Sequence, residues 1–590
     1  MFMKQCLINL MKDPCRFEPV TDQMKEAFPH VKFLQRYHPG LDAFPLGLSD
    51  RLSAALPTRY IIQEWLDTDP SDCRKRTVKI TDTSTETSLD VSTETSLDVS
   101  TETSLDVSGD TSSDVSQEAT VFVKTVHLLD PIALLQNEYT MPAHPLLPLG
   151  TQSWKNTLLK LHTPTNQAYV DAVASYVLGR LREQNMTPHA ALSYGSITGI
   201  ADRYKFKITD EYDSYRQCRW FWKGLKTKSA TLEVKRDEED VLEDPEYMDL
   251  VQEMFICPFD DLDRVVAEEE ELSVEKVEAL EDSGSLHSFD FDAEEESDKS
   301  EGSEKSSDSD SSESSDGTLF DVNLNMTNMP VIMICQEAQQ GTMDDLMDEE
   351  ELHGNVRDSV SWDQMWIAWT FQIVAALSFL QKHIAFTHND LHTNNIVWRT
   401  TEQTHLYYRA HDGTTFKVPT YGRIFSLIDF GRAIFRIQGE LWISDDHWPE
   451  HDAGGQYNFG PFYELDSPKV SPNPSFDLCR LAISMLEGLY DEHPNRKKGS
   501  STILSQEGSW KVHETVSPLF NLLWTWTLND DGETLFEDRH GNEKFPGFDL
   551  YIEIAHKVHD AVPKDQVRRP VFESFRYKGK VGSDTTVYSI

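Results

Sequence analysis

The chain has 590 residues, a formal net charge of −46 and a hydrophobic content of 38%. This length suffices for about two to four domains, but so acidic a composition indicates that part of the chain forms no packed core. No nucleic-acid partner is expected, because binding a phosphate backbone needs patches of lysine and arginine.

Residues 1–54 carry no functional signal and are interpreted as an N-terminal extension. Lys4, Asn9 and Lys12 interrupt the apolar residues at its start, so no signal peptide is expected. No long apolar run occurs anywhere in the chain, and no membrane span is expected. The seven cysteines are scattered without CxxC spacing, which favours neither a zinc site nor a disulfide framework. We therefore expect an intracellular protein, cytoplasmic or nuclear.

Two stretches are interpreted as disordered insertions. The first, residues 82–118, holds the octapeptide STETSLDV at 84, 92 and 100 and a decayed copy at 108. Each copy has one leucine and one valine to bury, which favours a tandemly duplicated surface loop. The second, residues 233–318, ends in EEESDKSEGSEKSSDSDSSESSDG and is interpreted as a solvated acidic linker. Its serines have acidic neighbours, so phosphorylation by acidophilic kinases stays open as an alternative.

Three stretches between and after the insertions have the pattern of packed elements. TVFVKTVHLL, residues 120–129, alternates around β-branched residues and predicts a strand. Residues 166–184 repeat apolar side chains at helical spacing after a Thr/Asn start, which predicts a helix. Residues 329–347 predict a short buried strand, a turn and an acidic helix start.

The clearest helix prediction covers residues 359–383. Ser361 is expected to cap this helix, with Gln364 three residues further on. One face is expected to be lined by four apolar side chains: Met365, Trp369, Ile373 and Leu377.

A polar loop, FTHNDLHTNNIVW, follows that helix at residues 386–398 and leads into a predicted strand. A second strand begins near residue 424, after a hairpin-like insertion. Transfer of a phosphoryl group from ATP needs a carboxylate to accept the substrate hydroxyl proton and oxygen ligands to hold Mg²⁺. Asp390 fits the first role, and Asn395 and Asp429 fit the second.

These residues carry a family resemblance. HNDLHTNN, residues 388–395, resembles the H-R-D-L-x-x-x-N catalytic loop of protein kinases, and D-F-G follows at 429–431 as in that superfamily. The order of the flanking segments is similar: VFVK, TPHAALSYG, VIMICQEAQQGTMDDL, SFDLCRLAISMLEGL and, as the last helix, DQVRRPVFESF. VPTYGRIFSLIDFGRAIF is similar to kinase-like proteins of large DNA viruses and some protists, and His392 resembles haspin-type kinases. The resemblance covers roughly residues 120–577, less the insertions.

The resemblance implies ATP and Mg²⁺ as cofactors and a role for several further residues. Lys124 would contact the α- and β-phosphates, and Asp477 would anchor the catalytic loop from below. His392, neutral at pH 7, would donate one hydrogen bond to the γ-phosphate. Three residues would surround adenine, Gln336 as gatekeeper and two that offer backbone groups, Glu337 and Ala338.

The implied fold class is α+β, a bilobal protein-kinase-like fold. A small β-rich N-terminal lobe with one main helix would span residues 55–338 and carry both insertions. A larger, mostly helical C-terminal lobe would span residues 339–577, with ATP in the crevice between the lobes. Residues 578–590 would form a C-terminal tail.

The chain departs from the family pattern around the phosphates. No G-x-G-x-x-G precedes Lys124, so the loop that covers the phosphates is missing, displaced or rebuilt. Lys160 is a rival for the phosphate-binding lysine, and Lys124 is preferred because it lies in a strand pattern. No glutamate is evident on the following helix. Asp171 is the candidate partner of the lysine despite its shorter side chain; the alternative is that Asp171 is an exposed charge.

Asn389 stands where the family has the arginine that pairs with a phosphorylated activation loop. Residues 432–474 contain no threonine and no A-P-E. A phosphate there would lack its best partner, so we predict activity that does not depend on phosphorylation of this loop.

TLNDDGETLFED, residues 527–538, has part of the pattern of a calcium-binding loop. Thr527 stands at the first ligand position, and Asp538 stands where a bidentate glutamate belongs. The sequence therefore favours a plain turn.

Three functions compete. The first is a protein serine/threonine kinase with Asp390 as catalytic base, which transfers the γ-phosphate of ATP to a protein substrate; the acidic insertion would favour a basic one. The second is a pseudokinase that binds nucleotide or serves as a scaffold, which the absent glycine loop supports. The third is a small-molecule kinase of the aminoglycoside or choline phosphotransferase type, whose loops share the second histidine. A viral origin would place the protein in the host cell.

Overall fold

The computed structural model describes most of the chain outside the two predicted insertions. The described residues are 20–36, 38–41, 56, 58–82, 117–140, 152–209, 211–227, 230–235, 255–259, 262, 321–357, 359–437, 439–449, 451–457, 472–507 and 510–590. The predicted disorder of 82–118 and 233–318 therefore falls almost wholly outside them. The chain divides into two compact units, one of residues 1–128, 160–200 and 330–590 and one of residues 129–159 and 201–329.

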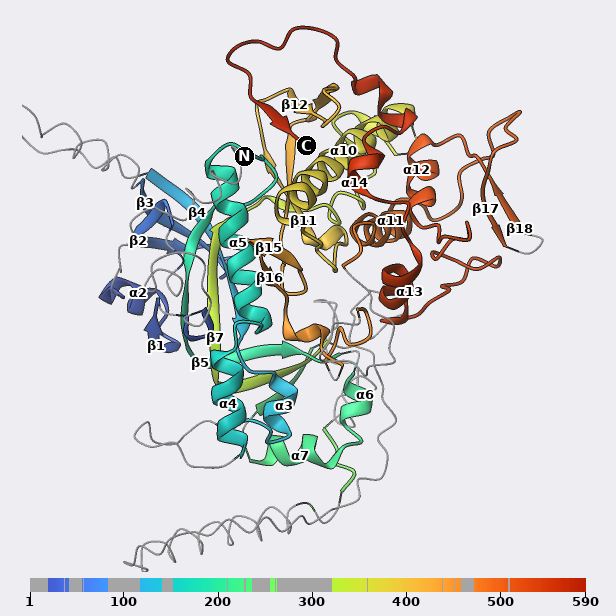
Figure 1. Cartoon of the computed structure of the whole chain (residues 1–590). Coiled ribbons are helices and arrows are strands. Elements are labelled where there is room, and N and C mark those ends of the chain that lie inside the picture. The colour runs from blue at the N-terminus through green and yellow to red at the C-terminus, as the bar shows by residue number, and fades with distance from the viewer. Residues whose placement is uncertain are drawn as a thin grey trace, which may run out of the picture. The chain divides into compact units, whose positions relative to one another are not determined.

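The fold is mixed α+β and contains a seven-stranded sheet in the order β1-β5-β7-β4-β3-β2, with β6 paired to β7. Its strands are β1 (Val31–Gln35), β2 (Tyr60–Thr68), β3 (Lys75–Asp82), β4 (Gln117–His127), β5 (Ser193–Lys207), β6 (Ala230–Lys235) and β7 (Asp321–Glu337). The pairs β2–β3, β3–β4, β4–β7 and β6–β7 are antiparallel. The strand predicted at 120–129 is confirmed as β4 (Figure 1).

The two faces of this sheet in the first unit bury different partners. Val121 and Val123 of β4 pack with α2 (Asp22–Ala27) in a small core. Because side chains alternate along a strand, Lys124 and Val126 face the opposite side. On that side Ile332 and Ile334 of β7 join the main core, which includes α5 (Gln167–Glu183). In Figure 1, α5 runs alongside the sheet.

Helix α5 confirms the helix predicted at 166–184. The side chain of Asn166 caps it by accepting a hydrogen bond from the Ala168 N–H at 3.1 Å. Nearly all of its residues are buried, so it is a core helix and not a surface helix with one apolar face.

Helix α10 (Val360–Ile384) is the centre of the main core. Nineteen of its residues are buried, so the face predicted from Met365, Trp369, Ile373 and Leu377 is too narrow a description. The predicted cap at Ser361 is wrong. Ser359 caps the helix, because its hydroxyl accepts from the Trp362 N–H at 3.2 Å, whereas Ser361 already lies in the first turn.

The remaining elements of the first unit are short. The helices are α11 (Phe476–Leu489), α12 (Pro518–Trp526), α13 (Asp549–Lys557) and α14 (Pro563–Gln566), with 3-10 turns at Pro39–Leu41, Thr393–Asn395, Asp445–His447 and Pro570–Phe575. The strands are β8 (Gly341–Thr342), β9 (Glu351–Leu352), β10 (Asn355–Val356), β11 (Ile396–Thr400), β12 (His405–Arg409), β13 (Thr415–Pro419), β14 (Arg423–Leu427), β15 (Phe435–Ile437), β16 (Glu440–Trp442), β17 (Ile503–Glu507), β18 (Trp510–His513) and β19 (Val587–Ser589). The predicted hairpin insertion is confirmed as β12–β13, and the tail adds β19 as its third strand.

Two helix predictions in this unit are wrong. No helix starts within 329–347; Met343 and Leu346 are buried and the chain makes single turns, with Leu346 N–H donating to the Met343 carbonyl. The last helix is broken into α14 and a 3-10 turn. Pro570 causes the break, since proline lacks the N–H and disfavours helical backbone at Arg569.

Among its described residues, the second unit contains β6, residues 201–207 of β5 and residues 321–329 of β7. Its described helices are α3 (Pro131–Leu135), most of α4 (Gln152–His162), α6 (Tyr212–Tyr215) and α7 (Arg219–Lys226). Helices α3 and α7 pack closely, because Gly224 leaves room for Leu135; a Cβ at this glycine would lie 2.5 Å from Leu135 Cδ2. None of the helices in the described part of the chain has the length and apolar character that crossing a membrane requires.

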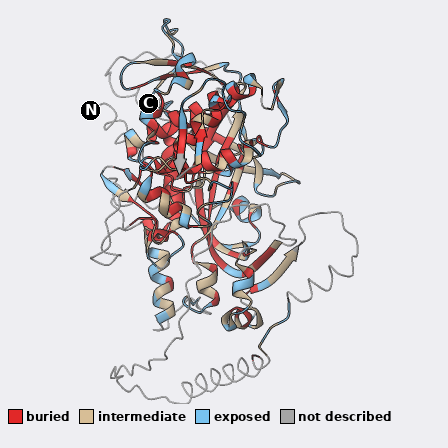
Figure 2. Cartoon of the chain, turned by 90° about the vertical axis from the view of Figure 1, so that its right-hand side faces the viewer, coloured by how far each residue is buried: buried red, intermediate tan, exposed pale blue. Residues whose placement is uncertain are grey.

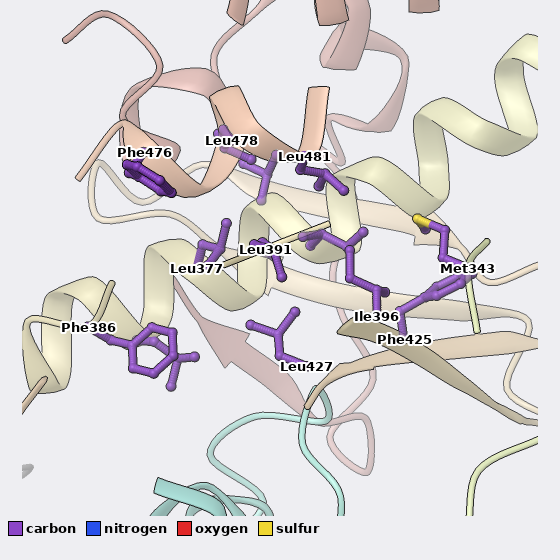
Figure 3. Packing of buried hydrophobic residues seen from close by; sticks show 14 of the residues in the cluster. Met343, Leu377, Phe386, Leu391, Ile396, Phe425, Leu427, Phe476, Leu478 and Leu481 are labelled. Carbon is purple, nitrogen blue, oxygen red and sulfur yellow. The ribbon is translucent and has the colours of Figure 1, made fainter. Parts of the chain in front are cut away.

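Beneath the polar loop, the main core joins α10, α11, β11 and β14. Buried residues are red in Figure 2. Figure 3 labels these residues of the core near the loop: Met343, Leu377, Phe386, Leu391, Ile396, Phe425, Leu427, Phe476, Leu478 and Leu481. Leu391 lies inside the loop itself and is fully buried. A loop with an apolar anchor in its middle is held in one conformation by the core.

Candidate active site

The polar loop is tied down at both of its ends. Ala385, directly after α10, caps the helix in the left-handed region, φ 49°. Thr387 and Ile434 then exchange two backbone hydrogen bonds, at 2.8 and 2.9 Å. At the far end, the Ile428 N–H donates to the Asn395 carbonyl at 3.1 Å. These bonds fix the loop against the segment that follows β14.

Asp477, at the start of α11, lies directly under the loop, as expected from the resemblance. Its carboxylate accepts the backbone N–H groups of His388 and Asn389 at 3.0 Å. Asn389 has φ 65°, a left-handed conformation that asparagine tolerates better than most residues. Burial raises the pKa of Asp477 to about 6, although the His388 ring and the two backbone donors favour its charged form.

Asp390, His392 and Asn395 converge at the surface of the loop. Asn395 Nδ2 donates to the Asp390 carbonyl at 2.8 Å and lies 3.0 Å from His392 Nε2. His392 Nε2 is 4.0 Å from Asp390 Oδ1. Burial by itself would raise the pKa of Asp390, but Arg432, His392 and the Tyr551 hydroxyl outweigh it and lower that pKa. The carboxylate is thus held ionised, as a base must be.

Asp429 stands two residues beyond the end of β14. The antiparallel register of β11 and β14 pairs Ile396 with Leu427, which brings Asn395 and Asp429 to the same edge. Asp429 has φ 62°, and its side chain is 47% exposed. Burial opposes its ionisation, yet the charge and hydrogen bond of Lys124 lower its pKa. An amide and a carboxylate at one edge fit the few hard oxygen ligands that Mg²⁺ takes beside phosphate.

Lys124 joins the sheet, α5 and the residues after β14. Its Nζ lies 2.6 Å from Asp171 Oδ2 and 2.8 Å from Asp429 Oδ1. Burial would lower the pKa of this lysine, but the two carboxylates raise it above its usual value. Asp171 Oδ1 also accepts the Phe430 N–H at 3.1 Å. The predicted pairing of Lys124 with Asp171 therefore exists.

The short side chain of Asp171 suffices because α5 lies close to the sheet. Ala168 and Ser175, one turn before and one turn after Asp171, are small and buried. Gly179 permits the same closeness further along, since a Cβ there would lie 2.8 Å from the Ser193 nitrogen. A longer glutamate is not needed at this separation.

Lys160, the rival lysine, lies elsewhere. It lies in the last turn of α4, and its Nζ is 2.5 Å from Asp445 Oδ2, in a pair whose side chains are only 14% and 7% exposed. The neighbouring Asp446 accepts from Gln167 Nε2 at 2.5 Å, and burial together with Asp452 raises the pKa of Asp446 to about 8. These contacts hold the 445–447 turn against the start of α5.

Asn389, at the position where the kinase resemblance would place an arginine, holds residues 432–457 by neutral hydrogen bonds. Its Nδ2 donates to the Arg432 carbonyl at 3.0 Å, and its Oδ1 accepts from the Tyr457 hydroxyl at 2.7 Å. No phosphate is needed to connect the loop to residues 432–457.

Of the three residues expected around adenine, Gln336 and Glu337 end β7 and Ala338 follows it. Gln336 pairs with Phe122 of β4. The N–H groups of Glu337 and Ala338 donate to the carbonyls of Leu192 and Thr120, at 2.9 and 3.0 Å. These two donors are used by the protein itself. A ligand here would find carbonyl groups and the N–H of Gln339, which has no acceptor among the described residues.

The turn between β2 and β3 lies beside the strand of Lys124, where the kinase resemblance would lead one to expect a glycine-rich loop. The Val123 N–H donates to the Arg74 carbonyl at 2.8 Å, so the turn lies beside Lys124. Its residues are Asp69, Pro70, Ser71, Asp72, Cys73 and Arg74. Asp69 accepts from Ser71, and Asp72 pairs with Arg74 at 2.8 Å. Because the turn contains no glycine, no motif marks it in the sequence, and the sequence did not predict it.

Residues 527–538 form the plain turn that the sequence favoured. Asn529 Oδ1 accepts the N–H groups of Asp531 and Glu533, at 3.0 and 2.9 Å. Within the described ranges, no group of three or more His, Cys, Asp or Glu side chains is arranged to hold a metal. Asn395 and Asp429 would bind Mg²⁺ only together with phosphate oxygens.

No protein-family model matches the chain, and no curated protein matches it significantly.

Proposed function

We propose that this protein is an ATP- and Mg²⁺-dependent phosphotransferase with a bilobal protein-kinase-like fold, and that it phosphorylates serine or threonine in a protein substrate. The observation that carries the proposal is the meeting of Lys124, Asp171 and Asp429 beside the Asp390–Asn395 loop. These residues come from β4, α5, the polar loop and the end of β14. Chance assembly of this set, in the family's chain order, is a poor explanation.

The arrangement of strands supports the same fold. Strands β2, β3 and β4 precede α5, and β5 and β7 follow it, so one helix lies against a β-rich layer within residues 55–338. Residues 339–577 begin with β8 and then supply α10, the loop and α11. The lobe boundary at 338 and the crevice for ATP are part of the proposal.

Each residue has a defined task in the proposed reaction. Lys124 neutralises the α- and β-phosphates, and Asp171 holds it in place. Asp390 accepts the proton of the substrate hydroxyl while the new O–P bond forms and the bond from the γ-phosphorus to the bridging oxygen breaks, leaving ADP. Asn395 and Asp429 hold Mg²⁺, which when bound offsets the phosphate charge. His392 donates to the γ-phosphate.

The β2–β3 turn favours one alternative, a pseudokinase. Asp69 and Asp72 place carboxylates where a glycine loop would present backbone N–H groups to phosphate. Like charge weakens the binding of a triphosphate. Asp72 is already paired with Arg74, which limits this repulsion.

The test is transfer of radiolabelled γ-phosphate from ATP·Mg²⁺ to a basic protein by wild type, Asp390→Asn and Asp412→Asn. Asp412 lies in the β12–β13 turn and serves as a matched surface control. We expect label with wild type and Asp412→Asn, and a loss of about 10²–10⁴-fold with Asp390→Asn. No label, with a melting temperature that ATP·Mg²⁺ raises, would instead establish a nucleotide-binding pseudokinase or, if a metabolite accepts phosphate, a small-molecule kinase.

A further inference from the structure

A residue far along the chain contacts the proposed base. Tyr551, in α13, donates its hydroxyl to Asp390 Oδ1 at 2.8 Å. The two residues are 161 positions apart, and no motif joins them. Tyr551 is 2% exposed, so its hydroxyl is a buried group with a specific partner.

The direction of this hydrogen bond follows from its partners, because an ionised carboxylate can only accept, and a second contact leaves the hydroxyl hydrogen available. Arg480 Nε, in α11, donates to the same Tyr551 oxygen at 3.0 Å. The hydroxyl has one hydrogen, and because its oxygen accepts from Arg480 that hydrogen is free to point at Asp390. Donation from a guanidinium also strengthens the next bond in the series.

The tyrosine ring has little freedom to move. It stacks on Phe548 with a centroid distance of 5.2 Å and packs against Phe476 at 5.7 Å. The guanidinium groups of Arg480 and Arg432 lie over the ring at 5.4 and 5.9 Å. Phe476 is next to Asp477, so the tyrosine and the loop anchor share one support.

The contact determines which carboxylate oxygen is available. Oδ1 of Asp390 accepts from Tyr551, whereas Oδ2 accepts no hydrogen bond from the described residues. Fixing one oxygen of a carboxylate fixes the direction of the other, because the group is planar. Proton transfer needs the base within about 2.6–3.2 Å of the acceptor hydroxyl, so this direction matters.

We propose, on the basis of the phosphotransferase function argued above, that Tyr551 is a positioning residue that holds Asp390 Oδ1 so that Oδ2 receives the proton of the acceptor hydroxyl. Arg480 orients the tyrosine hydroxyl for this task. The opposing view is that Tyr551 blocks the base and must leave before substrate binds. The two views predict opposite signs when the hydroxyl is removed.

The experiment compares Tyr551→Phe with Tyr490→Phe in the full chain. Tyr490→Phe is a matched control, because its hydroxyl bonds Ser517 Oγ at 3.0 Å, away from Asp390. With ATP·Mg²⁺ and a basic protein, Tyr551→Phe should lower kcat about tenfold and leave the KM for ATP within twofold. A merely structural role would move both constants or neither. In an Asp390→Ala background, Tyr551→Phe should have no further effect on kcat.

Unchanged or increased kcat in Tyr551→Phe would overturn the proposal, and an increase would establish the blocking role. If wild type transfers no phosphate, the phosphotransferase proposal fails, and Tyr551 then has no role in catalysis. The melting temperatures of wild type, Tyr551→Phe, Asp390→Ala and the double variant then test the contact by itself. Tyr551→Phe should lower the melting temperature more with Asp390 present than with Ala at 390; equal shifts would overturn the contact.

Discussion

Lys124 and Lys160 both pair with carboxylates of the segment that follows β14, but the two pairs differ in their exposure to solvent. Asp429, one partner of Lys124, is 47% exposed, whereas Asp445 and Lys160 are only 7% and 14% exposed. An exposed carboxylate can give up its lysine to a ligand phosphate and be solvated by water. A buried carboxylate cannot, because it would be left as an uncompensated charge. The first pair therefore suits ligand exchange and the second suits structure.

Local sequence does not separate these two lysines well. Each follows an apolar residue, in VFVK and in TLLK, and each precedes α5. The two lysines differ in the secondary-structure elements that carry them. Lys124 lies in a central strand of the sheet, and Lys160 lies at the end of a helix.

The largest expected effect comes from replacing the ammonium group of each lysine by a guanidinium, which keeps the positive charge and tests whether the two lysines differ in role. Lys124→Arg should lower kcat/KM for ATP about 10²-fold, because a planar guanidinium cannot occupy the same point between Asp171, Asp429 and phosphate. Lys160→Arg, the matched change, should stay within threefold of wild type. Radiolabelled transfer measures both. Equal losses would show that the two lysines share one role.

The second effect concerns stability. Lys160→Met and Asp445→Asn should each lower the free energy of unfolding by about 3–5 kcal/mol, because each removes one partner of a buried pair. The double variant Lys160→Met/Asp445→Asn should lose less than the sum of the single changes, because it leaves no buried charge unpaired. Urea unfolding provides the values. Losses near zero for the single variants would place this pair in solvent.

The third effect is a pH dependence of stability due to Asp446, beside the Lys160 pair. Its folded pKa, about 8, lies above the usual 3.8, so the folded state binds a proton that the unfolded state has lost. Stability is then fully present below about pH 3.8 and declines by roughly 1.4 kcal/mol per pH unit until pH 8. Asp446→Asn should remove this decline. Urea unfolding of wild type and Asp446→Asn at pH 6 and pH 8 measures this decline. An equal loss of unfolding free energy between the two pH values in both proteins would contradict the prediction.

The smallest expected effect is that of phosphatase treatment. Asp445 already supplies a fixed negative charge to Lys160, and Asn389 connects the loop to residues 432–457 without an arginine. Treated and untreated protein should therefore transfer phosphate at rates within about twofold. Loss of most activity on treatment would overturn the idea that these contacts replace a phosphate.

Sequence reasoning worked best where chemistry and spacing are both local. Asp390, His392 and Asn395 lie within six residues, and α10 and β11 on either side of them follow from apolar pattern. It was less accurate at boundaries, which depend on single hydrogen bonds. Ser359 and Ser361 are both good caps by composition, and the choice between them is made by which hydroxyl reaches the Trp362 N–H.

The sequence by itself determined the strand at Lys124, the long helices α5 and α10, and the short polar loop with its acid and amide, because each rests on neighbours in the chain. Only the tertiary structure decided that Lys124 meets Asp171 and Asp429, that Lys160 meets Asp445, and that Tyr551 reaches Asp390. It also showed that an acidic turn, residues 69–74, lies beside Lys124. The physical reason is the same in each case: these contacts join residues separated by 47 to 305 positions, and only the packing of helices and strands sets which of many polar side chains come within hydrogen-bond distance.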